Sequence, residues 1–177
     1  ERVHYNDFGH APEDKHFIGN GLPKMYASWN NNIRFKSFDL SVTMRGAFGY
    51  QIINGARMNY ENPKNSRYEN RIKTVDRLVF GKATLNKNVE PEYNSYYVED
   101  GDFWKIDNIT LGYTFDKLNV KYIKSLRIYG SVLNTLTITG YEGIDPEVRT
   151  DGLTPGYDTR DRYPSIRSFT FGVGVKF

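Results

Sequence analysis

The side chains best able to do chemistry are carboxylates that gather in two short segments. They are Glu99, Asp100 and Asp102, and then Asp145, Glu147 and Asp151. Carboxylate oxygens suit calcium, but neither segment has the liganding order of an EF-hand loop. Solvated turns explain both segments better than a metal site does, so the sequence predicts no metal and no cofactor.

Other residue types that support catalysis also lack the spacing that a reaction needs. His4, His10 and His16 stand six residues apart, whereas histidines that share a metal usually lie closer on one strand or helix face. The segment Gly172-Val173-Gly174 belongs to an alternating strand pattern and not to a phosphate-binding loop. Because no nucleophile accompanies a base, we expect that the chain is not an enzyme.

Tyrosine is abundant, and three copies lie in one long loop near the end of the chain: Tyr141, Tyr157 and Tyr163. A tyrosine offers an apolar ring and a hydroxyl group, which suits both sugars and protein interfaces. We expect these three residues to contact a ligand or a lid protein, with simple packing of the loop as the alternative.

Apolar and polar side chains alternate strictly from Arg167 to Phe177. The apolar set is Phe169, Phe171, Val173, Val175 and Phe177. Such alternation predicts a strand with one apolar and one polar face. The apolar face could meet the core of a soluble β-sandwich or the lipid around a membrane β-barrel, so this strand alone leaves both interpretations open.

Two further alternating segments, Lys24–Lys36 and Phe38–Tyr50, flank a tight turn at Lys36 and Ser37. The turn predicts the pairs Phe35 with Phe38, Ile33 with Leu40, Trp29 with Met44, and, on the polar face, Arg34 with Asp39. Strands of about 13 residues are longer than the usual five or six in soluble sheets, and they can cross a bilayer at a tilt.

Two more strands are predicted at Phe103–Phe115 and Ser125–Ile138. In the first, the parity of the apolar residues changes near Asp107 and Asn108, which indicates either a β-bulge or a strand tip that rises above the apolar band. The connections between the five strands alternate between short and long, as they do in outer-membrane barrels. This alternation of short and long connections favours an all-β antiparallel meander that forms the C-terminal part of a transmembrane β-barrel.

The long polar stretch 51–97 holds one helix signal. Ser66 and Glu69 have the spacing of a capping box, and apolar residues follow at helical spacing until Gly81. We therefore expect a short surface helix in this stretch.

Composition argues against several classes of protein. Mean hydropathy is −0.64, and no apolar run approaches the roughly 18 residues of a transmembrane helix. The net charge of +3 is small, and the basic residues are spread along the chain, which argues against nucleic-acid binding. The chain begins in polar sequence without a signal peptide. Because a membrane barrel has to be exported, we expect the chain to be the end of a longer protein.

Five groups of residues occur in the order found in one known family. The groups are Ile18-Gly19-Asn20 with Pro23-Lys24; Phe38-Asp39-Leu40-Ser41; the block from Tyr97 to Phe115; Leu126-Arg127-Ile128-Tyr129 with Leu133-Asn134 and the segment from Tyr141 to Glu147; and Tyr163-Pro164 with Arg167 to Phe177. Over about residues 18–177, this ordered set resembles the C-terminal end of the SusC/RagA-like TonB-dependent outer-membrane transporters of Bacteroidetes.

The resemblance implies a barrel of about 22 strands around an internal plug, driven by TonB and capped by a SusD-like surface lipoprotein. Such transporters import glycans or oligopeptides. The implied partners are the remainder of the same barrel and its plug, the lipoprotein, the TonB complex through an N-terminal part, outer-membrane lipid, and a glycan or peptide substrate.

Five strands cannot close a barrel, because the smallest barrels have about eight. The resemblance therefore predicts that residues 1–177 are the C-terminal segment of a receptor barrel in the outer membrane, with the C-terminus in the periplasm. The alternative is a soluble β-rich carbohydrate-binding module that uses loop tyrosines.

The barrel interpretation also assigns roles to the alternating residues. The polar side chains expected to face the lumen are Arg34, Asp39, Arg45, Arg127 and Tyr129. The apolar residues Phe169, Phe171, Val173, Val175 and Phe177 resemble the C-terminal signal that the outer-membrane assembly machinery reads.

Deletion of Phe177 tests this assignment. An unpaired barrel strand exposes backbone groups that hydrocarbon cannot satisfy, so the strand has to be captured during insertion. We expect severely reduced outer-membrane levels of the full-length protein and degradation of its precursor. Membrane fractionation and heat-modifiable gel migration measure this, and normal assembly without Phe177 would remove the assignment. A soluble module would tolerate the deletion, because a terminal residue is usually dispensable.

Overall fold

The structure is a computed structural model that describes residues 17–63, 72–85, 93–116, 118, 120, 122–148, 152–159 and 161–177. The chain divides into two compact units. The first consists of Lys24–Phe48, Asp102–Gly140 and Pro164–Phe177, and the second of Glu1–Pro23, Gly49–Gly101 and Tyr141–Tyr163. Each unit is therefore assembled from segments that are far apart in the sequence.

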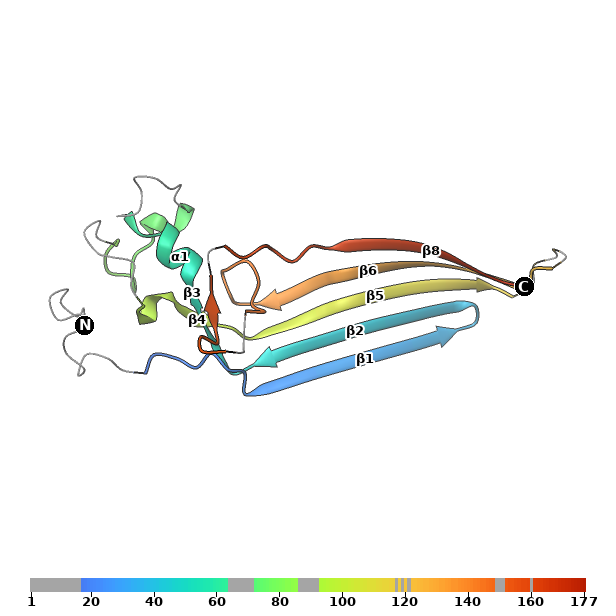
Figure 1. Ribbon diagram of the computed structural model, residues 1–177, viewed down its shortest axis with the longest axis horizontal. Helices are drawn as coiled ribbons and strands as arrows, with labels where there is room; N and C mark the ends of the chain where they lie inside the picture. Colours follow the sequence, from blue (N-terminus) through green and yellow to red (C-terminus); the bar gives the residue numbers. More distant parts are fainter. Residues whose placement is uncertain are drawn as a thin grey trace. The chain divides into compact units, whose positions relative to one another are not determined.

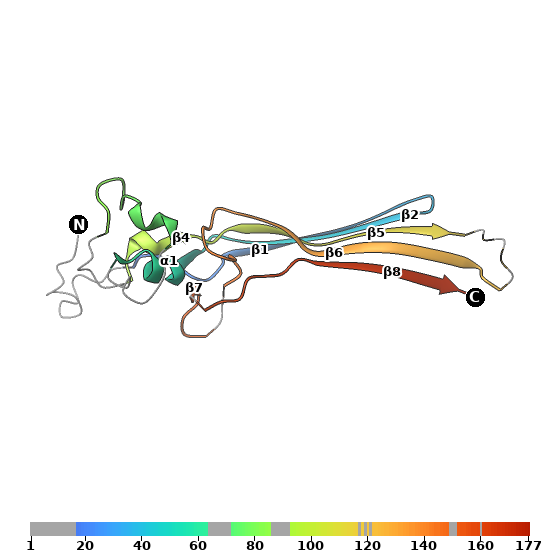
Figure 2. The same ribbon diagram turned by 90° about the horizontal axis from the view of Figure 1, so that it is seen from above.

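The first unit is a five-stranded antiparallel sheet with the order β1-β2-β5-β6-β8 (Figures 1 and 2). Its strands are β1 (Met25–Phe35), β2 (Phe38–Phe48), β5 (Phe103–Phe115), β6 (Ser125–Thr139) and β8 (Ser168–Lys176). These are the five strands expected from the alternation, with ends that differ by no more than about two residues, as is usual for strand boundaries. The predicted antiparallel meander is confirmed.

The hairpin of β1 and β2 has the register that its turn predicts. Phe35 pairs with Phe38, and the remaining three predicted pairs are also present. Lys36, at the turn, has a φ of 53°, the left-handed conformation that allows a tight reversal of the chain. Because a slip of one residue would exchange the two faces of the strand, the alternation and the turn select the same pairing.

The predicted bulge is present, and it belongs to a stepped irregularity across three strands. One cross-strand row is Val42, Ile109 and Val132, and the next is Met44, Ile106 and Leu136. Between the two rows lie Thr43 in β2, then Asp107 and Asn108 in β5, and then Leu133, Asn134 and Thr135 in β6. The bulge compensates for the parity change in β5, so Trp104 and Ile106 share a face with Ile109.

The second unit contains a three-stranded sheet and short helices. Its strands β3 (Gln51–Asn54), β4 (Val98–Asp100) and β7 (Tyr157–Asp158) are ordered β4-β3-β7. Its helices are α1 (Gly55–Tyr60) and the 3₁₀ helices η4 (Lys73–Asp76) and η5 (Ser95–Tyr97). Tyr50, Ile52 and Tyr97 are fully buried and form the centre of this unit.

The helix expected in the stretch 51–97 is absent from the part of it that the structure describes, residues 72–81. Ser66 and Glu69 lie outside the described residues, and the apolar residues that follow them form only the 3₁₀ turn η4 and an isolated bridge between Val79 and Ala83. Among the described residues of this stretch, the α-helix is α1, whose first turn is capped by the Asn54 side chain, 2.9 Å from the Arg57 amide. Its short length leaves little apolar periodicity to read, so the asparagine cap was its only clear signal.

Candidate functional site

One face of the five-stranded sheet is a continuous apolar surface. Cross-strand pairing aligns Ile33, Leu40, Leu111 and Phe171 in one row, and Phe35, Phe38, Tyr113, Ile128 and Val173 in the next. These side chains are largely exposed within this chain: Phe35 at 66% and Phe171 at 85%. Apolar patches that exceed a few hundred Å² usually contact another protein or a membrane, so this face requires an apolar environment.

Aromatic residues cluster at both ends of the apolar face. At the end near the β1–β2 turn, the ring of Tyr113 contacts the rings of Phe38 and Phe115 edge to face, with centroids 4.7 and 4.6 Å apart. At the opposite end, Phe48 stacks on Trp104 at 6.1 Å. Amphipathic aromatic rings favour the boundary between hydrocarbon and water, so the two clusters mark the limits of the apolar face.

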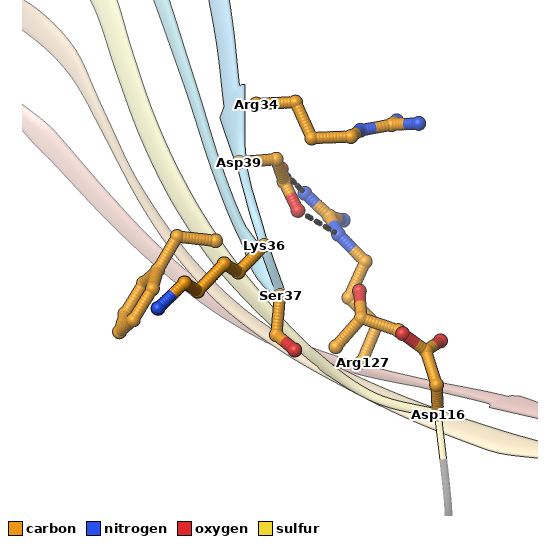
Figure 3. Close-up of a pocket in the computed structure, with 8 residues that line it drawn as sticks. Arg34, Lys36, Ser37, Asp39, Asp116 and Arg127 are labelled. Atoms are coloured by element: carbon orange, nitrogen blue, oxygen red, sulfur yellow. Dashed lines mark hydrogen bonds and ion pairs between the residues drawn. The ribbon is translucent and has the colours of Figure 1, made fainter.

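The opposite face of the sheet is polar and carries an ion pair that spans three strands. The Arg127 guanidinium on β6 donates two hydrogen bonds to the Asp39 carboxylate on β2, at 3.0 and 2.5 Å (Figure 3). The strand between them carries Gly112, whose added Cβ would lie 2.6 Å from both Arg127 and Asp39. Glycine at this position therefore leaves the space in which the ion pair forms.

A charged hollow surrounds this ion pair. Its volume is about 360 Å³, and it is lined by Arg34, Lys36, Ser37, Phe38, Asp39, Thr114, Asp116 and Arg127. Arg34 extends on the same side of the sheet as the ion pair, whereas the Lys36 side chain points away from it (Figure 3). The geometry therefore brings together three of the residues that the sequence assigns to the lumen: Arg34, Asp39 and Arg127.

Of the two remaining residues of that set, Tyr129 adjoins the ion pair, whereas Arg45 lies further along the sheet. The Tyr129 ring covers Gly172, where an added Cβ would be 2.3 Å from the ring, and the Arg127 guanidinium lies 4.8 Å from the ring centroid. Arg45 pairs with Asp107 at 2.6 Å, at the level of the bulge. The hydroxyl groups of Thr110 and Ser131 are hydrogen-bonded between these levels, 2.8 Å apart. Lumen-facing roles for all five residues stay predictions.

The three loop tyrosines have different environments in the second unit. Tyr141 is only 6% exposed, and its hydroxyl donates a 2.6 Å hydrogen bond to Oδ2 of Asp158. Tyr157 is partly buried and contacts Tyr93 edge to face. Tyr163 is 81% exposed. Packing explains Tyr141 within this chain, whereas Tyr163 presents most of its surface; contact with a ligand or lid stays a prediction for the three residues.

A buried ion cluster in the second unit was not foreseen from the sequence. The Arg57 guanidinium donates to the carboxylates of Glu61 and Glu99 at 2.9 and 2.5 Å. Burial alone would lower the pKa of Arg57, but its hydrogen bonds to these two carboxylates prevail and raise the pKa. A buried charge is tolerated when it is paired in this way. The helical spacing of Arg57 and Glu61 was the available sequence signal.

The acidic segments are used for structure. Glu99 belongs to the ion cluster, and Oδ1 of Asp145 accepts a hydrogen bond from the Glu147 amide at 3.0 Å. Asp151 lies outside the described residues. Among the residues that the structure describes, no group of three or more histidine, cysteine, aspartate or glutamate side chains is arranged to hold a metal ion.

Comparison with curated proteins places the relatives of this chain among TonB-dependent receptors. TonB-dependent receptor P39 of Formosa agariphila is 30% identical over 181 residues, which cover 94% of this chain and 17% of the relative. TonB-dependent receptor P3 of the same organism is 29% identical, with 93% and 17% covered. TonB-dependent receptor SusC of Bacteroides thetaiotaomicron is 26% identical, with 93% and 16% covered. The chain thus spans about a sixth of the length of these relatives.

Solved structures show the same fold. The RagAB peptide transporter matches 89% of this chain and 17% of its own with a TM-score of 0.75 at 21% identity. The RagAB peptide importer in its closed-closed state matches 89% of this chain and 18% of its own with a TM-score of 0.74 at 20% identity. No family model matches the chain.

These findings confirm the resemblance found in the sequence. The homologues of the chain are TonB-dependent receptors of the SusC/RagA-like group, and its sheet has the fold of their barrels. The relatives bear the names of receptors and importers, which agrees with the expectation that the chain is not an enzyme. The alternative of a soluble carbohydrate-binding module has no counterpart among these relatives. In the described part of the chain, no helix has both the length and the apolar character to span a membrane.

The buried carboxyl of Asp158 makes a pH-dependent contribution to the stability of the second unit. Burial raises the pKa of Asp158 above its ordinary value of 3.8, and Oδ1 of this carboxyl has no hydrogen-bond partner within the described residues. The folded state therefore binds the proton more tightly than the unfolded state, so the stability that this carboxyl contributes falls as the pH rises from 3.8 through the folded pKa. The Tyr141 hydroxyl acts in the opposite direction, because its hydrogen bond favours the ionised carboxylate and lowers the pKa of Asp158.

We expect Tyr141→Phe to destabilise the second unit by roughly 1–3 kcal/mol at neutral pH, because it leaves a buried carboxylate without its donor. The loss should be smaller near pH 4.5 and smaller in an Asp158→Asn background. Limited proteolysis of the full-length protein at the two pH values measures this. An equal loss in both backgrounds and at both pH values would contradict the proposed coupling.

Proposed function

We propose that this chain forms part of the barrel wall of an outer-membrane TonB-dependent transporter that imports glycans or oligopeptides with a SusD-like surface lipoprotein. The observation that carries the proposal is the two-sided sheet, in which apolar rows cross all five strands on one face and charged or hydroxyl side chains occupy the other. A barrel wall in a membrane has this arrangement, with lipid outside and an aqueous lumen inside.

The length of the apolar face supports a membrane-spanning role. About ten residues separate Phe38 from Phe48, which corresponds to about 34 Å along a strand at ~3.4 Å per residue. A strand tilt of about 40° would reduce this length to roughly 26 Å, close to the ~25 Å apolar band of outer-membrane barrels. The aromatic clusters at the two ends of the face then lie where interfacial girdles are found.

The assignment of the other face follows from the same geometry. Arg34, Asp39, Arg45, Arg127 and Tyr129 would face the lumen, and the charged hollow beside Asp39 and Arg127 would then be open to water. The hairpin turn at Lys36 and Ser37, like the C-terminal end of β8, would lie at the periplasmic rim, because short turns occupy that side of such barrels.

The substrate and partners are proposed from the relatives. SusC and the RagAB peptide importer support an energy-coupled importer with a surface lipoprotein. The plug, the remaining strands and the contact with TonB would come from parts of the protein outside this chain. Tyr141, Tyr157 and Tyr163 are proposed to lie in a loop on the ligand and lid side, with Tyr163 the most available for direct contact.

A pair of neighbouring substitutions tests the assignment of the two faces. Val42 lies in an apolar row, and the next residue, Thr43, pairs with Asn30 and Asn108 on the polar face. We expect Val42→Arg to destabilise the full-length barrel by roughly 2–4 kcal/mol if the site lies near the midplane of the bilayer. Folding titration in lipid or detergent measures this loss.

Thr43→Arg is the matched control, because it introduces the same charge one residue along the same strand. It should have a mild effect, since its side chain would reach water in the lumen. If the two variants lose the same amount of stability, the membrane assignment of the faces is wrong.

A further inference from the structure

Asn31 places an amide side chain on the apolar face of the five-stranded sheet. It alternates in β1 with Trp29 and Ile33, so these three side chains share one face. Pairing across the sheet sets Asn31 in a row whose other members are all apolar: Val42, Ile109, Val132 and Phe169. Asn31 is therefore the polar member of an apolar row.

This row lies well inside the apolar face. Val42, the partner of Asn31 in β2, is four residues from Phe38 and six from Phe48, about 14 and 20 Å along the strand at ~3.4 Å per residue. Asn31 is thus far from the aromatic clusters that mark the two limits of the face. An amide without a hydrogen-bond partner is costly in hydrocarbon, and polar side chains at such a depth usually have a partner or a function.

The Asn31 side chain has no hydrogen-bond partner among the residues that the structure describes, and it is partly buried. The residue opposite it in β2, Val42, has no polar side-chain atom to offer. On the other face of the sheet, by contrast, the Ser131 hydroxyl donates to the Asn108 amide oxygen at 2.7 Å. A partner for Asn31 would therefore come from outside this chain.

The position of Asn31 indicates where that partner lies. β1 is the edge strand of the sheet (Figure 1), and within the described residues it pairs with β2 on one side only. In a membrane every backbone N–H and C=O group needs a partner, and five strands are too few to close a barrel. Another strand of the full-length barrel therefore lies along the free edge of β1. Facing residues of antiparallel strands have Cβ atoms about 4.5–5.5 Å apart, so a side chain of that strand reaches Asn31 whatever else covers the apolar face.

We propose that Asn31 forms a hydrogen bond with a polar side chain of this neighbouring strand and thereby fixes the register between the two strands. Alternation decides which face meets the lipid, but every pairing that differs by two residues satisfies it equally. A single register sets Asn31 beside its partner, and the others leave both groups unpaired. Buried asparagines select the register of coiled coils in the same way. This inference rests on the proposed function, because only a membrane makes an unpaired amide costly on this face.

Urea titration of the full-length barrel in phospholipid vesicles tests the proposal. We expect Asn31→Leu to lower the folding equilibrium constant by about three- to thirtyfold, the range for hydrogen bonds between side chains in membranes. An amide that faced lipid alone would give the opposite sign, because hydrocarbon favours leucine over an unpaired amide. A rise in the folding constant would therefore overturn the inference.

A double-mutant cycle identifies the partner, which is the hydrogen-bonding side chain opposite or diagonal to Asn31 in the neighbouring strand. Its replacement by leucine should lower the folding constant by a similar factor. The double replacement should return to within about threefold of the wild type, because it leaves neither group unpaired. Losses that add in the double variant would overturn the inference, as would a neighbouring strand without such a side chain.

Asn32→Leu is the matched control, because Asn32 is the next residue of β1, is exposed, and pairs with Ser41 on the polar face. Its folding constant should stay within about threefold of the wild type, and a loss equal to that of Asn31→Leu would overturn the inference. If Asn31→Leu instead separates associated copies of the barrel in sedimentation experiments, the partner is a second copy and the inference is also wrong. If the wild-type protein folds without lipid or detergent, the proposed function fails, and the inference fails with it.

Discussion

The five-stranded sheet depends on the period of two with which a β-strand directs its side chains to opposite faces. An uncompensated extra residue would move every later side chain of a strand to the wrong face. In β5, the apolar residues change parity at Asp107, and the bulge at the same point compensates for the change. Trp104 and Leu111 therefore occupy one apolar face although one has an even and the other an odd position in the sequence. The continuity of the face depends on this match between sequence and backbone.

The arrangement of the polar face depends on glycines, which leave space, as much as on the large polar side chains that use this space. One cross-strand row contains Asp39, Gly112, Tyr129 and Gly172 in that order. Each glycine of this row therefore lies next to a larger side chain. Each glycine leaves room for a large side chain from an adjacent strand to cross the sheet. Because of this space, Arg127 reaches a carboxylate two strands away, and the Tyr129 ring covers the backbone at Gly172. Charge alone would not place these groups together.

Much of the sheet could be predicted from the sequence, because alternation and turn chemistry act locally. The strands, the register of the first hairpin and the bulge near Asp107 follow from them. The second unit could not be derived in the same way. Its core combines Tyr50 with Tyr97, and its buried ion cluster joins Arg57 to Glu99, so both depend on contacts between distant segments that carry no common period. The ion pair of Asp39 with Arg127 could not be predicted for a similar reason: alternation assigns both residues to the polar face, but their pairing depends on the space above Gly112 in the strand between them.

The ion pair that crosses Gly112 also has a mechanical consequence. Sliding one strand against its neighbour by two residues would keep every side chain on its own face, so the alternation offers no resistance to such a shear. That displacement would move Arg127 away from Asp39 by about 7 Å, at ~3.4 Å per residue, and would break both hydrogen bonds of the pair. The pair therefore acts as a diagonal brace across β2, β5 and β6. A force applied along the strands, as when a bound partner is pulled, would be shared among these three strands. It would not act only on the backbone hydrogen bonds between one pair of neighbouring strands.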